Sequence, residues 1–99
     1  MKKENYSELI IESANQSKDL YCKALQMAKC QQYMRVQLYL KEANKYLGEA
    51  SALHLKMFSD DFNRQEYGLS LVYAEDVLMS VELYKTMVLF FIDIYKNIS

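Results

Sequence analysis

The sequence contains no proline and only two glycines, Gly48 and Gly68, in 99 residues. Proline and glycine are the residues that most often end helices and form turns, so this chain has few places at which it can reverse direction. We therefore expect long helices joined by a small number of turns. The length allows one domain, residues 1–99, with a modest hydrophobic core.

The spacing of apolar residues predicts three helices, at about residues 4–30, 33–58 and 68–98. In the first, apolar residues recur every three or four positions from Tyr6 to Ala28, which is typical of an amphipathic helix. The pattern lapses at residues 30–32, where we expect a tight turn without glycine, and at the polar residues 59–68, a loop or flexible joint. The fold class is predicted to be all-α, an antiparallel three-helix bundle. The second helix has the clearest seam, with steps of four and three that suit helix packing at a shallow angle: Val36, Leu40, Ala43, Leu47, Ala50, His54 and Met57.

The third helix is apolar on nearly every side. Two further apolar stripes, one from Val77 to Tyr95 and one from Leu71 to Ile92, accompany its main stripe. Two helices of the same chain can cover only part of such a surface, and the remainder would exceed what a soluble monomer usually exposes. We therefore expect the chain to form an oligomer through its third helix, the alternative being that this face binds a different protein. The main stripe consists of Leu69, Val72, Asp76, Met79, Leu83, Met87, Phe90 and Ile94.

Charge and composition argue against several classes of function. Twelve basic and 13 acidic residues give a net charge of -1, without the basic stripe of a nucleic-acid-binding protein. The longest apolar run, residues 87–92, is too short to span a bilayer, and the N-terminus does not resemble a targeting signal. Cys22 and Cys30 lie eight residues apart with no second pair, so we expect free thiols in a cytoplasmic protein that does not insert into a membrane.

Asp76 and His54 are the two seam positions with residues unsuited to a core. Burying an isolated carboxylate costs several kcal/mol unless it is paired or binds a cation. In a symmetric oligomer each subunit would bring one Asp76 to the axis, where carboxylate oxygens suit Mg²⁺ or another divalent cation. Alternatively, Asp76 faces solvent or bonds a hydroxyl such as that of Ser80. His54, the single histidine, is expected to be partly buried at a packing joint, and a zinc site within one chain is not expected.

Four segments, residues 10–14, 23–28, 40–44 and 75–80, together resemble the IIA component of the lactose/cellobiose class of bacterial sugar phosphotransferase systems. The resemblance covers nearly the whole chain. It implies a trimer of three-helix subunits with a divalent cation held at Asp76. It also implies a role as a phosphoryl carrier between the general phosphocarrier protein and a sugar-specific IIB component.

The phosphoacceptor position departs from the family pattern. Members carry a histidine three residues before the aspartate, in a motif close to His-Gly-Gln-Asp-His-Leu-Met, and residues 73–79 read Tyr-Ala-Glu-Asp-Val-Leu-Met. Tyr73 therefore stands at the acceptor position. A family histidine late in the second helix corresponds to Ser51, and the glutamine that follows it corresponds to His54. A phenol is a poor nucleophile at neutral pH, and its phosphate ester is too stable to pass on.

Three hypotheses follow from the sequence. The chain is first expected to be a family paralogue that cannot carry phosphate and acts by docking or as a regulator. Alternatively, it is a helical trimerisation or interaction module unrelated to sugar transport. In the third hypothesis, it is a working carrier whose phosphoryl group has moved to His54.

Overall fold

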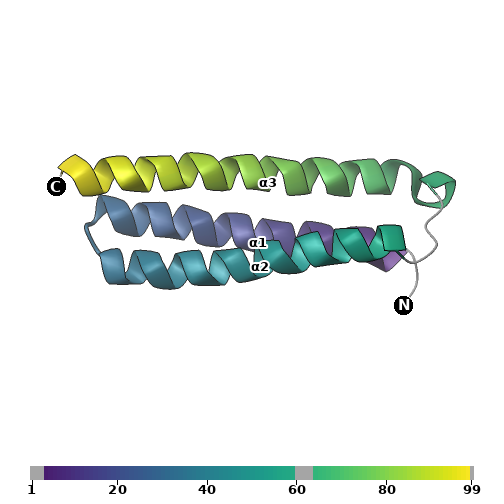
Figure 1. Ribbon diagram of the computed structural model, residues 1–99, viewed down its shortest axis with the longest axis horizontal. Helices are drawn as coiled ribbons and strands as arrows, with labels where there is room; N and C mark the ends of the chain where they lie inside the picture. Colours follow the sequence, from purple (N-terminus) through teal and green to yellow (C-terminus); the bar gives the residue numbers. More distant parts are fainter. Residues whose placement is uncertain (1–3, 60–63, 99) are drawn as a thin grey trace.

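The computed structural model describes residues 4–59 and 64–98. Within these residues the chain forms three helices and no strand: α1 (Glu4–Lys29), α2 (Tyr33–Ser59) and α3 (Arg64–Ile98). The helices lie side by side in a rod of 51 × 19 × 17 Å, and the chain reverses its direction between successive helices (Figure 1). The prediction of an all-helical fold with three helices is confirmed.

The first helix, α1, packs against both of the others, whereas α2 and α3 contact one another only sparsely. Its buried face carries several small side chains, including Ala14, Ser17, Ala24 and Ala28. Small side chains on a helix allow a neighbouring helix to approach closely. The subunit is therefore held together mainly through α1.

The seam predicted for α2 forms its inward face. Five of the seven seam residues are buried, and Leu40 and His54 are half-buried. Burial of apolar surface is the main favourable term in folding, at about 25 cal/mol per Å². The buried members are Val36, Ala43, Leu47, Ala50 and Met57.

The turn between α1 and α2 is made without glycine, as predicted. Gln31 adopts a left-handed conformation with φ of 60°. The amide of Gln32 donates to the carbonyl of Met27 at 2.9 Å, and the amide of Gln31 donates to the carbonyl of Ala28 at 3.0 Å. This pair of hydrogen bonds is the Schellman motif, in which the left-handed residue is usually glycine because a side chain is strained there.

The third helix begins before the position expected from the sequence. Residues 59–68 were predicted to be a loop or flexible joint, but α3 starts at Arg64 and is interrupted by Gly68, with φ of 49° and ψ of -132°. Only glycine adopts such a conformation readily. The prediction of a loop is therefore wrong for residues 64–67, which belong to α3, and the helix is interrupted only at Gly68. Residues 60–63 of the predicted loop lie outside the described residues.

The main apolar stripe of α3 is exposed along the whole helix, whereas the other two stripes supply most of its buried face. Leu83 is 72% exposed and Phe90 is 63% exposed, while Leu71, Leu78 and Val81 are buried. The prediction that two helices of the chain cover only part of α3 is therefore confirmed. We call the exposed residues of the main stripe the bare stripe: Leu69, Val72, Asp76, Met79, Leu83, Met87, Phe90 and Ile94.

Two buried polar side chains of α1 bind α2. The hydroxyl of Ser17 donates to the carbonyl of Ala43 at 2.8 Å, and the phenol of Tyr21 donates to the side-chain oxygen of Asn44. Burial raises the pKa of Tyr21 above its ordinary value of 10.0, and a hydrogen bond with Ser17 opposes that rise. These contacts fix how α1 and α2 are placed along one another.

Candidate functional site

Asp76 lies in the first half of the bare stripe and is exposed. It follows Val72 by four residues and precedes Met79 by three, so it shares a face of α3 with apolar side chains on either side. The hydroxyl of Ser80 donates to the carbonyl of Val77 at 2.9 Å rather than to this carboxylate. Asp76 is therefore an acidic residue within an otherwise apolar surface.

Tyr73 is also on the outer side of α3. Its side chain is 61% exposed, and it precedes Asp76 by three residues, close to one helical turn. Residues at this spacing are neighbours on a helix surface. The structure therefore places a phenol and a carboxylate beside one another at the edge of the bare stripe.

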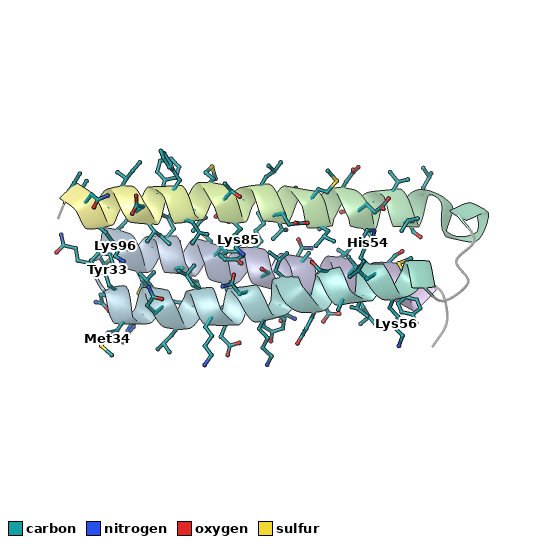
Figure 2. The ribbon with its side chains drawn as sticks, viewed as in Figure 1. Tyr33, Met34, His54, Lys56, Lys85 and Lys96 are labelled. Carbon is teal, nitrogen blue, oxygen red and sulfur yellow. The ribbon has the colours of Figure 1, made fainter. Side chains whose placement is uncertain are left out.

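His54 lies between α2 and α3, as Figure 2 shows, and its partner is Glu75. The Nε2 atom of His54 is 2.9 Å from the Oε2 atom of Glu75, and the two side chains are 25% and 27% exposed. An imidazole N–H that donates to a carboxylate is held in one orientation. The expectation of a partly buried histidine at a packing joint is confirmed.

The structure therefore does not unite the three candidate residues in one site. Each residue of an α-helix is rotated by about 100° from the one before it, so Glu75 and Tyr73 point to nearly opposite sides of α3. His54 belongs with Glu75 on the inner side, whereas Tyr73 and Asp76 are on the outer side.

Glu75 is the residue that sequence reasoning missed. The signal that could have identified Glu75 is its position between Leu71 and Leu78, both of which are buried. A polar residue at such a spacing on the inner face of a helix needs a partner, and His54 is the half-buried polar residue of the facing seam.

In the part of the chain that the structure describes, potential metal ligands do not gather within one subunit. Among the described residues, no group of three or more His, Cys, Asp or Glu side chains is placed to hold a metal ion. Cys22 is half-buried and Cys30 is exposed, and both are free thiols.

A comparison with protein families identifies the scaffold. The family of the lactose/cellobiose-specific IIA subunit of the phosphotransferase system (PTS) matches residues 6–96. The chain belongs to this family. The comparisons of the chain with curated proteins and with solved structures found no match.

The family match covers all three helices of this IIA-like protein, so it includes Tyr73, Asp76 and His54. In the described part of the chain, none of the three helices has the continuous apolar length that a membrane-spanning segment requires. The resemblance placed the phosphoacceptor position at residue 73, and the structure has an exposed phenol there. The chain therefore has the scaffold of the family and a tyrosine at the position where the resemblance implies a histidine.

Proposed function

We propose that this protein is a lactose/cellobiose-type IIA-like protein that docks on phosphotransferase components without carrying a phosphoryl group. The observation that carries the proposal is Tyr73, an exposed phenol where the family resemblance expects the acceptor imidazole. A phosphoryl carrier needs a nucleophile that accepts the group and then releases it readily, and a tyrosine phosphate ester does not. The protein then acts by docking on phosphotransferase components or by regulating them.

The proposed assembly is a homotrimer formed through the bare stripe. Eight residues along one face of α3 remain exposed although seven of them are apolar. Exposed apolar surface that runs the length of a helix favours packing against another helix. Three copies of α3 around one axis would cover the stripe, which is the arrangement that the family resemblance implies.

The proposed assembly also gives Asp76 a role. Each subunit contributes one carboxylate from within the bare stripe, and oxygen ligands suit a hard divalent cation such as Mg²⁺. The exposure of Asp76 in a single subunit and the apolar residues around it fit a site shared between copies. A cation there would offset the repulsion between the carboxylates that assembly brings together.

Incubation with the phosphorylated general phosphocarrier protein tests the proposal. We expect no acid-labile gain of mass, together with measurable binding to the phosphocarrier or to a IIB component by surface plasmon resonance. An active family member serves as the positive control for transfer. Acid-labile phosphate on any residue of this chain would overturn the claim that it carries none.

A second candidate is a carrier that uses His54, favoured by the contact between His54 and Glu75. A carboxylate that orients an imidazole is a usual arrangement for a reactive histidine. This candidate predicts acid-labile phosphate that the substitution His54→Ala abolishes. Our proposal predicts that His54→Ala changes nothing in the same assay. If the protein forms an oligomer but binds no phosphotransferase component, the result would favour the hypothesis of a helical interaction module unrelated to sugar transport.

A further inference from the structure

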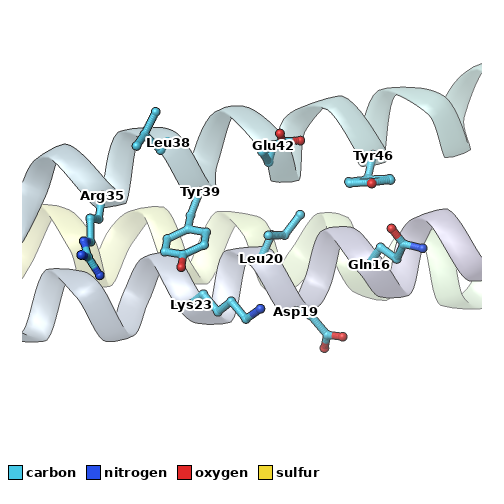
Figure 3. Close-up of a pocket in the computed structure, with 9 residues that line it drawn as sticks. All are labelled: Gln16, Asp19, Leu20, Lys23, Arg35, Leu38, Tyr39, Glu42 and Tyr46. Carbon is cyan, nitrogen blue, oxygen red and sulfur yellow. The ribbon is translucent and has the colours of Figure 1, made fainter.

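A shallow groove runs between α1 and α2 on the face of the subunit opposite to α3. Its open volume is about 620 Å³. Figure 3 shows α3 behind the two helices that form it, so assembly through the bare stripe leaves the groove open. Nine residues line this α1/α2 groove: Gln16, Asp19, Leu20, Lys23, Arg35, Leu38, Tyr39, Glu42 and Tyr46.

The lining residues of α2 include two pairs that are seven positions apart. Tyr39 and Tyr46 are seven residues apart on α2 and both are half-buried, so they form an aromatic seam along the groove. Arg35 and Glu42, also seven apart, flank the seam. A seven-residue repeat of apolar positions flanked by charged positions is typical of a surface that packs against another helix.

The shape of the groove also suits a helix. From Arg35 to Tyr46 the lining covers eleven steps of α2, or about 16 Å at 1.5 Å per residue. In Figure 3 the phenol of Tyr39 extends from α2 toward α1, while Leu38, which is 66% exposed, points away from it. A groove of this length between two helices accommodates about three turns of a third helix.

Charge along the groove changes sign. On each helix the basic lining residue lies nearer than the acidic one to the turn between α1 and α2: on α1 Lys23 is nearer than Asp19, and on α2 Arg35 is nearer than Glu42. Within the residues that the structure describes, none of these four charged side chains forms an ion pair. Their charges are therefore available to a molecule that lies in the groove.

We propose that the α1/α2 groove binds an amphipathic helix of a partner protein. The apolar side of that helix packs on the aromatic seam. An acidic residue of the helix faces Arg35, and a basic residue two turns away faces Glu42. This inference does not depend on the proposed function, because the residues that carry it are distinct from Tyr73, Asp76 and the bare stripe.

Synthetic helical peptides test the proposal with the full-length chain. Three peptides share one leucine seam and differ only in charge: one has Glu and Lys two turns apart at the flanking positions, one has Glu at both, and one has Lys at both. We expect the mixed peptide to bind at least about tenfold more tightly by fluorescence anisotropy, with the difference shrinking as salt is added. Equal binding of the three peptides would overturn the proposal.

Variants of the groove sharpen the test. Tyr39→Ala should weaken binding of the mixed peptide, whereas Leu55→Ala, which removes an exposed leucine of α2 outside the groove, should not. The double substitution Asp19→Lys and Glu42→Lys makes the charged lining wholly basic, so the preferred peptide should become the one with Glu at both positions. Circular dichroism establishes that each variant is folded.

Two results would contradict the proposed occupant. If Tyr39→Ala and Leu55→Ala have the same effect on peptide binding, the aromatic seam is not the contact. If Tyr39→Ala lowers the oligomeric state of the free chain while Leu55→Ala does not, the groove binds a second copy of this chain instead of a partner.

Discussion

The imidazole of His54 and the carboxylate of Glu75 meet between α2 and α3 with 2.9 Å between Nε2 and Oε2. Two residues before Glu75, Tyr73 points to the other side of α3 and is exposed. His54 is therefore not a nearby substitute for the imidazole missing at position 73. A carrier that used His54 would have to receive its phosphoryl group at a different place on the subunit.

The substitution Tyr73→His tests whether the scaffold still docks. If only the acceptor has been lost, an exposed imidazole at position 73 should accept about one acid-labile phosphoryl group per subunit from the phosphorylated general phosphocarrier protein. Mass spectrometry before and after acid treatment measures it. Tyr73→Phe is the matched control and should remain unmodified. A variant with histidine that binds the phosphocarrier but gains no phosphate would show that more than the acceptor is missing.

Assembly through the bare stripe is tested with two leucines of similar exposure. Leu83 on α3 is 72% exposed and Leu55 on α2 is 69% exposed. Leu83→Asp should convert the proposed trimer to monomers, because burying an unpaired carboxylate costs several kcal/mol in each subunit. Leu55→Asp should leave the trimer intact. Light scattering after size-exclusion chromatography measures both, and a wild-type monomer at micromolar concentration would remove the basis of the proposed assembly.

The substitution Asp76→Leu should not weaken the proposed trimer. Where it raises the free energy of dissociation, the gain should be roughly 1 kcal/mol or more per assembly. The reason is that leucine makes the bare stripe continuously apolar and removes the repulsion between carboxylates. Dissociation on dilution measures the effect. Added Mg²⁺ should stabilise the wild type and have no effect on the variant. Complete loss of assembly would mean that Asp76 makes a specific bond within the interface.

Gln31→Gly should stabilise the subunit by roughly 0.5–1 kcal/mol. Gln31 has φ of 60°, where glycine avoids the strain of a side chain, although glycine also gains freedom in the unfolded chain. Urea denaturation followed by circular dichroism measures the change. Gln32→Gly, one position later in the same turn, adds the same freedom without relieving strain and should destabilise. Equal effects of the two substitutions would argue against the Schellman turn.

Tyr21 should make the protein sensitive to alkali. Because burial raises its pKa in the folded state, its contribution to stability is complete below the ordinary pKa of 10.0 and is lost as the pH rises through the folded value. Tyr21→Phe should cost about 1 kcal/mol at neutral pH through the lost hydrogen bond with Asn44, and should reduce the fall in stability above pH 10.0. Urea denaturation across this pH range checks it.

Tyr84 is the second tyrosine expected to contribute to that alkaline sensitivity. Burial is the main cause of its raised pKa, followed by a hydrogen bond and an electrostatic interaction with Cys22 and by the negative charge of Asp19. Tyr84→Phe should therefore also reduce the loss of stability at high pH.

The sequence predicted those features that depend on local periodicity. The seam of α2 and the glycine-free turn at Gln31 follow from the spacing of apolar residues and from the place where that spacing lapses. The sequence also predicted that α3 has more apolar surface than two helices of the chain can cover. Which stripe of α3 would face α1 did not follow from the sequence, because all three stripes are apolar and the choice depends on how the helices pack.

The contact between His54 and Glu75 and the α1/α2 groove were beyond prediction for a different reason. Each joins residues from two helices, so each depends on how far one helix is shifted along the other. Periodicity within one helix does not determine that shift. Here it is determined partly by Tyr21 and Ser17, whose hydrogen bonds to α2 become visible only once the helices are packed.

The position of α1 at the centre of the subunit restricts how the protein can evolve. Its small buried residues, such as Ala14 and Ala28, belong to the face through which α1 contacts the other two helices. A larger residue at either position would strain that packing and shift a neighbouring helix, and with it the bare stripe or the groove. Natural variation that adapts one surface to a new partner without disturbing the other must therefore fall on exposed positions, while the buried face of α1 stays nearly fixed.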